Sequence, residues 1–234
     1  MIQFISLNTI ITDLLNIIRG AKVSQSETIS RRQIEDWVNQ YRAVLIKQDI
    51  DKGKMPNPDY IQELPSLLLE VVDKTQESDL QSLSYYLRTV LELPNTIDLN
   101  FKPGFTYVGT TDGTEIQFVP EGRSYWQQFK RFTFKTPLAF LRNKRIYINT
   151  VTPIKYITIR GIFEIPMEAS NFINTSSEVV YSTMDDRYPI PANMVPVLKD
   201  MILQKELGIV AQAPSDNKND SVNEVSPNVE QTRA

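Results

Sequence analysis

The sequence of 234 residues contains neither cysteine nor histidine. Disulfides, thiolate nucleophiles, serine–histidine and cysteine–histidine dyads and the common zinc sites all require a thiol or an imidazole. This chain can therefore form none of them. Any catalysis would have to use carboxylates, lysine, serine or tyrosine.

Glycine is also scarce, with eight residues, and the motifs GxxxxGK(S/T), GxGxxG and GxSxG do not occur. Such motifs hold phosphates or present a nucleophilic serine. The adjacent acids Glu35 and Asp36 point about 100° apart on a helix and cannot share a site. The acidic pairs at 49/51 and 185/186 are expected at a solvated helix end and in a loop. We therefore expect no catalytic, cofactor-binding or metal-binding residue, and a protein that is not an enzyme.

Long apolar runs are missing too. A membrane-spanning helix needs about 20 consecutive apolar residues, and no stretch of this sequence approaches that length. Residues 1–20 lack the basic region of a signal peptide and include Asp13. We expect a soluble protein with no membrane partner. Its 41% of hydrophobic residues, with ten Tyr and ten Phe, are sufficient for a core.

Apolar residues recur at helical spacing in three places. The first predicted helix is capped by Asn8 or Thr9. The second, much longer, follows Ser30, which forms a capping box with Gln33. The third covers 193–207, with its prolines before or in the first turn, where proline is tolerated. A long amphipathic helix needs a partner, so we expect these three helices to pack into a small bundle.

From about Thr89 the hydrophobic period changes to 2, which is typical of strands. Turn residues separate the runs, and Asp112-Gly113 predicts a hairpin. The expected strands are TVLELP, TIDLNF, FTYVGT, EIQFV, FKRFTFK, AFLRN, RIYINT and KYITIRGIFEI. Upstream, SLLLEVVDK predicts one more strand, whereas QESDLQSLSYYLR is ambiguous between a helical turn and a loop. GRSYWQQFKR is expected as a short helix or an irregular crossover.

These elements predict an α+β fold, with a β-module inserted between helices that form one bundle. The module is expected to be an antiparallel β-sandwich or a barrel. From Ala213 onward the sequence has almost no core-forming residues, which is typical of a disordered tail. The expected divisions are an N-terminal helical part at 1–60, a connecting segment at 61–88, a β-rich domain at 89–188, a C-terminal helix at 189–210 that packs with the N-terminal helices, and a flexible arm at 211–234.

Charge is unevenly distributed along the chain. Residues 123–145 contain seven basic residues and no acidic one, which gives +7 in a chain whose net charge is −3. The remainder therefore carries −10. Residues 49–98 contain ten acids against four bases. Such segregation can steer association. The seven cations of the basic segment are Arg123, Lys130, Arg131, Lys135, Arg142, Lys144 and Arg145.

Three interpretations of this basic segment compete. Its cations alternate with aromatic residues and can bind nucleic acid through phosphates and stacking. They can instead contact the acidic segment of a neighbouring copy, a heterologous contact that builds rings or filaments. In the third interpretation the cations face water and the aromatic residues form strand core. We favour a contact between copies for the cations, because an acidic protein is a poor general binder of nucleic acid, and strand core for the aromatic residues. These are Tyr125, Trp126, Phe129, Phe132 and Phe134.

Several longer phrases of the sequence resemble virion structural proteins of tailed bacteriophages, especially those of the crAss-like group. The resemblance is collinear and spans most of the chain, and none of the phrases is a catalytic motif. They are RRQIEDWVNQYRAVLIKQDIDKG, NPDYIQEL and LEVVDK in the first part, LRTVLELPNTIDL, FTYVGTTDG and YITIRGIFEIPMEA in the β region, and YPIPANMVPVLKDMILQKEL near the end.

The resemblance implies a head-to-tail connector subunit of a short-tailed phage, which is an adaptor or ring protein beneath the portal. Such proteins form homo-oligomeric rings, typically of about twelve copies, around the DNA channel. The implied partners are the portal protein, neighbouring tail or ring proteins and, non-specifically, DNA in the channel. The implied location is the virion, assembled in the host cytoplasm. A C-terminal helix or arm often grips the portal in such adaptors, and the candidate docking residues here are Met201, Gln204 and Lys205.

One charge pattern conflicts with the helix that carries it. Arg31 and Arg32 lie in the first turn of the second helix, where the helix dipole favours anions, and they cost a few tenths of a kcal/mol each. A ring gives them a role as contacts to an acidic neighbour, so they join the candidate interface residues. The alternatives are another minor capsid or tail protein, a nucleic-acid-binding module that uses residues 123–145, and a carboxylate-only enzyme, which needs two acids in one cleft.

Overall fold

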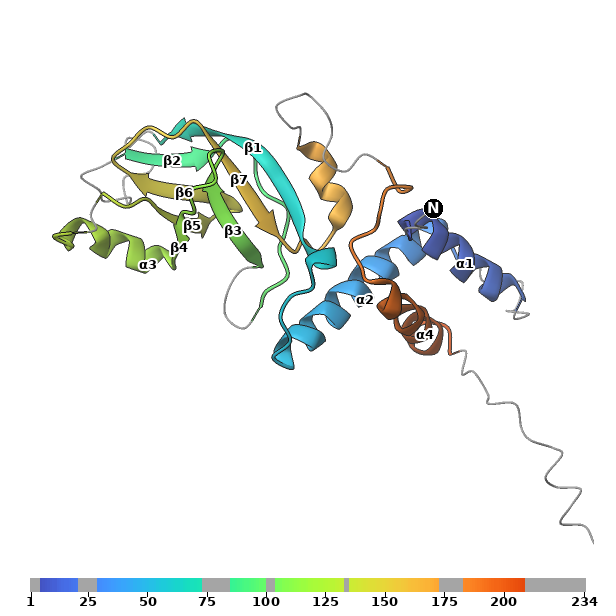
Figure 1. Ribbon diagram of the computed structural model, residues 1–234. Coiled ribbons are helices and arrows are strands. Elements are labelled where there is room, and N and C mark those ends of the chain that lie inside the picture. The colour runs from blue at the N-terminus through green and yellow to red at the C-terminus, as the bar shows by residue number, and fades with distance from the viewer. Residues whose placement is uncertain are drawn as a thin grey trace, which may run out of the picture.

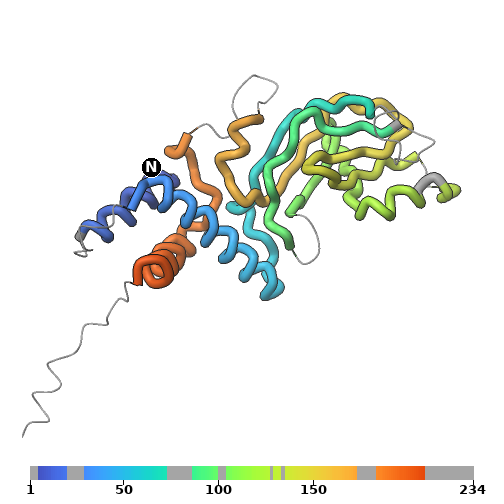
Figure 2. The backbone as a smooth tube through the Cα atoms, turned by 180° about the vertical axis from the view of Figure 1, so that it is seen from behind, coloured from blue at the N-terminus to red at the C-terminus, as the bar shows by residue number. Residues whose placement is uncertain are grey.

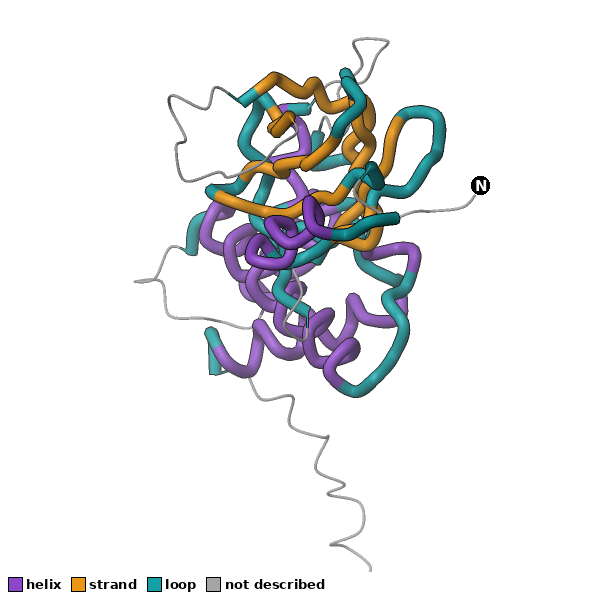
Figure 3. Tube along the Cα trace, turned by 90° about the vertical axis from the view of Figure 1, so that its left-hand side faces the viewer, coloured by secondary structure: helices purple, strands orange, loops and turns teal. Residues whose placement is uncertain are grey.

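The computed structural model describes residues 5–20, 29–72, 85–99, 104–132, 135–172 and 183–208. Helices α1 (Leu7–Gly20), α2 (Arg31–Asp51) and α4 (Val195–Lys205) lie together on one side of a seven-stranded sheet (Figure 1). The views from behind and from the side show the same separation (Figures 2 and 3). The α+β fold predicted from the sequence is confirmed. The arm expected at 211–234 lies outside the described residues.

The three helices share one apolar core. Leu14 of α1, Val38 of α2 and Leu198 of α4 have no exposed surface. An ion pair between Lys199 Nζ and Asp13 Oδ2, 2.6 Å apart, also joins α4 to α1. The predicted bundle is therefore confirmed. Its buried members are Leu7, Ile10, Ile11, Leu14, Ile18, Ile34, Val38, Tyr41, Leu45, Tyr188, Ile190, Val195, Leu198 and Ile202.

The sequence predicted the N-terminal cap of α2 correctly but not that of α1. The hydroxyl oxygen of Ser6 accepts a hydrogen bond from the amide of Thr9 at 3.2 Å, so Ser6 caps α1. The predicted caps Asn8 and Thr9 lie instead in its first turn. The start of α2 is as predicted, since Ser30 Oγ accepts from the Gln33 amide at 3.1 Å.

The sheet has the strand order β3-β7-β1-β2-β6-β5-β4. Neighbouring strands are antiparallel except β4 and β5, which are parallel, so the expectation of a purely antiparallel module is corrected to a mixed sheet. A parallel pair needs a crossover of a dozen or so residues, and 119–137 supplies it. The strands are β1 (Gln62–Val71), β2 (Tyr85–Thr89), β3 (Phe105–Thr110), β4 (Gln117–Phe118), β5 (Leu138–Arg142), β6 (Arg145–Thr150) and β7 (Tyr156–Gly161).

The two outer strands of this order, β3 and β4, meet at the predicted hairpin turn. Gly113 occupies the left-handed region, with φ of +86°, and the amide of Ile116 donates to the carbonyl of Val108 at 2.8 Å. A single β-bridge joins Gly109 to Glu115. Because this turn joins both ends of the strand order, the sheet forms a nearly closed barrel. The buried interior includes Leu64, Leu69, Leu87, Ala139, Ile146, Ile148, Ile157 and Ile159.

The segment 61–88, expected to connect the helices to the β-rich region, contains β1 and most of β2. Both strands lie in the middle of the sheet, where β1 pairs with β7 and β2. The register of β1 shifts between Leu64 and Leu67, and Ser66 has a φ of +55°. This bulge interrupts the alternation of apolar residues, which is why the sequence pattern located only the second half of the strand.

Three other runs do not form the strands predicted for them in the described part of the chain. TVLELP contributes only Thr89, the last residue of β2, and the described part of TIDLNF contains isolated bridge residues only, among them Thr96, which pairs with Phe163. Residues 129–132 of FKRFTFK end a 3₁₀ helix and form a turn. The amide of Ile97 donates to Ile162 O at 3.0 Å. In this region, where the sheet meets the helices, the segments around Ile97 and Ile162 are joined by single hydrogen bonds and not by a continuous ladder.

Helix α2 is long because it serves both parts of the molecule. Its first half packs in the bundle, whereas Ile46 and Ile50 of its second half pack with Tyr60, Ile97 and Ile162 beside the sheet. Short 3₁₀ helices η1 (Pro58–Tyr60), η3 (Pro166–Asn171) and η4 (Ala192–Met194) lie at the connections between the two parts. The bundle and the barrel are therefore joined by a packed apolar junction.

Candidate subunit and partner interface

The basic segment begins with a short helical element on the outside of the barrel. Helix α3 (Glu121–Ser124) continues directly into the 3₁₀ helix η2 (Tyr125–Phe129). The ring of Tyr125 packs on Tyr86, Phe140 and Tyr147, which form an apolar cluster of their own. The Tyr125 hydroxyl donates to Glu121 Oε1 at 2.9 Å, and burial followed by this hydrogen bond raises the pKa of Tyr125 to about 12. One face of α3–η2 is thus fixed to the sheet.

The other face of this element is exposed and aromatic. Trp126, Phe129 and Phe132 are 68%, 73% and 89% exposed, and the Trp126 and Phe129 ring centroids are 6.0 Å apart. The guanidinium carbon of Arg131 lies 5.6 Å from the centroid of Phe132. The prediction that the aromatic residues form strand core is therefore wrong for these three. The reason is that residues 121–129 are helical and 131–132 form a turn, so the side chains do not alternate as in a strand.

We call this surface the aromatic tip: Trp126, Phe129 and Phe132 with the exposed cations Arg123, Lys130 and Arg131. It lies at the end of the barrel that is remote from the helical bundle (Figures 1 and 2). Exposed apolar side chains are ordinary when they are scattered singly. Three large exposed aromatic residues within seven positions form a cluster, and clusters of this kind are typical of interaction sites.

Arg142 and Arg145, which belong to the seven cations of the basic segment, lie beside carboxylates of the same chain. Arg142 Nη1 lies 3.4 Å from Glu121 Oε1, and Arg145 lies 3.6 Å from Glu70 and 3.8 Å from Glu92. Glu70 and Glu92 belong to the acidic segment 49–98. The two oppositely charged segments therefore meet, in part, inside one subunit, because β1, β2, β6 and β5 are neighbours in the sheet. The remaining cations, Arg123, Lys130, Arg131, Lys135 and Lys144, are exposed.

A row of side chains across the outer face of the sheet explains where Glu70 points. It faces Arg88 across the β1–β2 ladder, and Arg88 faces Tyr147 across the β2–β6 ladder. Arg88 Nε donates to Glu70 Oε1 at 2.6 Å. Hydrogen bonds to Glu70 and then Tyr147 raise the pKa of Arg88 above its usual value. Glu70 thus balances two arginines of its own chain and is not a free contact for a neighbour.

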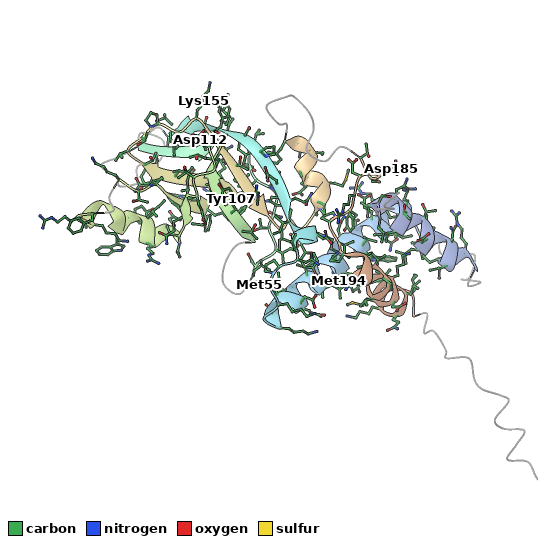
Figure 4. The ribbon with its side chains drawn as sticks, viewed as in Figure 1. Met55, Tyr107, Asp112, Lys155, Asp185 and Met194 are labelled. Atoms are coloured by element: carbon green, nitrogen blue, oxygen red, sulfur yellow. The ribbon has the colours of Figure 1, made fainter. Side chains whose placement is uncertain are left out.

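Arg31 and Arg32, the arginine pair at the start of α2, have different surroundings. The Nη2 atom of Arg31 donates to the side-chain oxygen of Asn8 in α1. The amide nitrogen of Asn8 in turn donates to Asp185 Oδ1 at 2.6 Å. Figure 4 shows Asp185 beside α1, in the segment that leads toward α4. Through Asn8, Arg31 thus joins three separate segments of the subunit, although both it and Arg32 are exposed.

The C-terminal end of α4 is tied to α2. The hydroxyl of Tyr41 donates to Glu206 Oε1, and this bond, followed by burial, raises the pKa of Tyr41. Among the candidate docking residues, Lys205 has its Nζ 5.6 Å from the Tyr41 ring centroid. Met201 is half-buried against the bundle core, and Gln204 is exposed. The predicted docking helix therefore offers Gln204 and Lys205 to solvent, but little of Met201.

The described residues were also compared with the requirements of a metal site and a membrane span. Within them, no group of three or more Asp or Glu side chains is arranged to hold a metal ion. None of their helices combines the length and the apolarity that crossing a bilayer requires.

Two structural features were missed by the sequence patterns. The first is Arg42, which is fully buried between the bundle and the barrel. The available signal was its position in α2, between Tyr41 and Leu45 on the buried stripe. The second is the exposure of the aromatic tip. Its signal was the spacing of Trp126 and Phe129, three residues apart, which fits one face of a helix but would put the two rings on opposite faces of a strand.

A family model described as phage tail ring protein 2 matches residues 9–225. The matched region includes both helical and β parts, from α1 to beyond α4. A search of curated proteins finds no match to the chain.

Proposed function

The chain belongs to the phage tail ring protein 2 family, a group of structural proteins of the crAss-like phage tail, and from this premise we propose that it is one subunit of a homo-oligomeric ring in the portal–tail connector. The ring would join capsid to tail around the DNA channel, with about twelve copies. Its partners are the portal protein and adjoining tail or ring proteins. The protein resides in the virion and needs no enzymatic activity for this role.

The observation that carries this proposal is the presence of two unlike surfaces at opposite ends of one packed subunit. The aromatic tip lies on the barrel, and the exposed end of α4 lies on the bundle. A closed ring needs heterologous contacts, in which one surface of a subunit binds a different surface of the next. The junction around Arg42 holds the two ends in a fixed relation, so that successive contacts can repeat the same rotation.

The end of α4 supports a contact along the axis of the stack. Gln204, Lys205 and Glu206 are exposed, and residues 209–234 follow directly. Fully extended, those residues could reach about 85 Å. We propose that this end of the bundle and the arm engage the portal or an adjoining ring. The exposed Arg32, at the start of α2, is a further candidate contact on the bundle.

A nucleic-acid-binding module is the second candidate function. The observation that favours it is the exposure of Trp126, Phe129 and Phe132 beside cations, since bases of a single strand stack on such rings. Against it stands the net charge of −3 for the whole chain. In the ring proposal, contact with DNA is non-specific and confined to the channel.

The decisive experiment is a cryo-EM reconstruction of the virion vertex, with rotational symmetry determined rather than imposed. The proposal expects density for this fold in a ring between capsid and tail, with the channel on its axis. Density for the chain as a fibre, as a decoration of the capsid surface or only inside the capsid would contradict it. Native mass spectrometry of the purified chain gives the copy number of any ring that forms without the portal.

A further inference from the structure

We infer that the aromatic tip is the docking surface by which one copy of this chain binds a carboxylate-bearing surface of the next copy. This inference rests on the proposed ring and names the contact that would build it. The tip is the only part of the described basic segment that combines exposed cations with large exposed apolar side chains.

The first argument is that the aromatic rings of the tip are exposed to water, so that their burial against a partner would be favourable. Packing Tyr125 on the sheet and pairing Glu121 with Arg142 hold α3–η2 in place without burying Trp126, Phe129 or Phe132. Removal of such side chains from water is favourable in proportion to the apolar area removed. A supporting structure of this kind keeps the rings in position before a partner arrives, so little conformational entropy is lost on docking.

The second argument concerns the class of partner. Tryptophan and arginine are the residues most enriched at the centres of protein–protein interfaces. In duplex DNA the bases are stacked and their faces are not accessible, so exposed rings contribute little there. A phosphate-binding surface would be expected to carry cations across a wide face, but Arg142 and Arg145 are already paired with Glu121, Glu70 and Glu92. The tip therefore fits a protein surface better than a nucleic acid.

The third argument identifies the partner as a second copy by charge. Outside residues 123–145 the chain carries −10. Exposed carboxylates lie in other segments than the tip, among them Asp51 and Asp98 of the acidic segment 49–98. Arg123, Lys130 and Arg131 at the tip complement such a surface and steer the encounter. Because the tip and the carboxylates occupy different places on the subunit, the contact is heterologous, and it forms a ring where the repeated rotation closes on the first copy.

The test uses the full chain and four proteins: wild type, Trp126→Ala/Phe129→Ala/Phe132→Ala, Arg123→Glu/Lys130→Glu/Arg131→Glu, and the control Val197→Ala. Val197 is 48% exposed on α4, away from the tip, and reports the effect of removing any exposed apolar side chain. Circular dichroism and thermal unfolding first show that each monomer is folded. Native mass spectrometry and sedimentation velocity then measure self-association.

We expect the wild type and Val197→Ala to associate, and both tip variants to weaken the contact by about 30-fold or more, the effect of losing one strong interface residue. Raising NaCl from about 50 mM to about 500 mM should weaken the association of the wild type and the residual association of the aromatic variant, because both keep the cations of the tip and salt screens charges. It should not weaken the residual association of the charge-reversed variant, which has lost those cations. A further substitution, Asp51→Arg or Asp98→Arg, is then combined with the charge-reversed tip. It should restore association where that carboxylate belongs to the receiving surface.

Three results would overturn the inference. The aromatic variant could associate as well as the wild type. It could keep its self-association and lose binding to a DNA oligonucleotide, which would assign the tip to nucleic acid. The wild type could remain monomeric up to about 100 µM, far above the Kd range of stable contacts. None of these results decides whether the chain forms a ring in the virion, since the vertex reconstruction tests that separately.

Discussion

The guanidinium of Arg42 donates from Nη1 to the carbonyl oxygen of Phe163, 2.8 Å away, just beyond the end of β7. Its Nε donates to the carbonyl of Pro189, also at 2.8 Å, and its Cζ lies 5.5 Å from the Tyr188 ring centroid. One side chain of α2 thus binds the exit of the barrel and the segment that leads into α4. The packing of the bundle against the barrel therefore depends on a buried cation whose hydrogen bonds are accepted by backbone carbonyls of two distant segments.

Replacing Arg42 by Met should destabilise the subunit strongly. Hydrogen bonds from a charged group contribute roughly 1.5–3 kcal/mol each, and two buried carbonyls would lose their donor. We expect the free energy of unfolding to fall by about 2–4 kcal/mol in a urea titration. Arg42→Lys should recover only part of this, because an ammonium lacks the planar fork.

The matched control for Arg42 is Arg32→Met, on the same helix but exposed. A surface change of this kind is expected to stay within about 0.5 kcal/mol. Equal stability of the Arg42→Met and Arg32→Met variants would show that the buried guanidinium does not hold the junction together.

Gly104 should tolerate no side chain. A Cβ there would lie 2.5 Å from the carbonyl oxygen of Ile97 and 3.1 Å from that of Ile162, both backbone atoms that cannot turn away. Gly104→Ala should therefore cost about 1–3 kcal/mol of unfolding free energy, as overpacking does. In Gly122→Ala, by contrast, the new Cβ has no atom within 4 Å, and a gain of up to about 1 kcal/mol is expected in a helix. Thermal unfolding of both variants would contradict the prediction if Gly104→Ala melted at or above the wild type.

Alkaline pH should destabilise the fold through two buried tyrosines. Burial, followed by the nearby Asp49, raises the pKa of Tyr60 to about 12, and Tyr125 is raised to about 12 as well. A raised pKa means that the folded state holds its proton longer than the unfolded state. Stability is therefore fully present below about pH 10 and is lost as the pH rises from about 10 to about 12.

The measurement is urea unfolding at several pH values across this range, with tyrosinate absorbance followed in parallel. Tyr60→Phe and Tyr125→Phe should each flatten the decline in stability, because neither ring can ionise. Tyr156→Phe controls for the general effect of removing one tyrosine hydroxyl. A decline that is unchanged in the Tyr60→Phe/Tyr125→Phe double variant would assign the alkaline sensitivity to other groups.

The sequence predicted those features that depend on local pattern. Ser30 and the apolar stripe from Ile34 to Leu45 defined α2, and Gly113 marked the turn at which the barrel closes. The predicted run RIYINT coincides with β6, whereas β7 ends at Gly161, four residues before the end of its predicted run KYITIRGIFEI. Local pattern located both strands because apolar residues recur at every second position in each.

What the sequence did not predict depends on which segments meet. The pairing of Glu70 with Arg145 requires β2 to lie between β1 and β6, and no local pattern states that order. A count of charges along the chain therefore overstated the surface available to a neighbour. Similarly, the position of Arg42 on the buried stripe of α2 indicates burial, but only the carbonyls of Phe163 and Pro189, which come from distant segments, explain how a buried guanidinium is hydrogen-bonded.

Truncation after Gly208 tests the role of the C-terminal arm. Gly208 follows α4 with a φ of +61°, and the bundle core is complete before it. We expect the truncated chain to unfold at nearly the same temperature as the wild type, but to attach less well to the portal in a co-sedimentation assay. Loss of folding on truncation, or attachment equal to that of the full chain, would contradict the proposed role of residues 209–234.

The last prediction separates Arg31 from Arg32. Both cations oppose the dipole of α2, which has no acidic residue in its first turn. Arg32→Glu should stabilise the monomer by a few tenths of a kcal/mol, up to about 1. Arg31→Glu should not, because it removes the donor to Asn8 and brings a carboxylate toward Asp185, which Asn8 already binds.

Urea unfolding of the two single variants at equal protein concentration measures this difference, and assembly measured on the same samples shows whether Arg32 contacts a neighbour. If it does, Arg32→Glu raises the stability of the monomer and weakens association, because a carboxylate replaces the cation that an acidic partner would bind. A gain in both stability and association would mean that Arg32 faces only water. A stabilising effect of Arg31→Glu equal to that of Arg32→Glu would show that the contact with Asn8 contributes nothing to the fold.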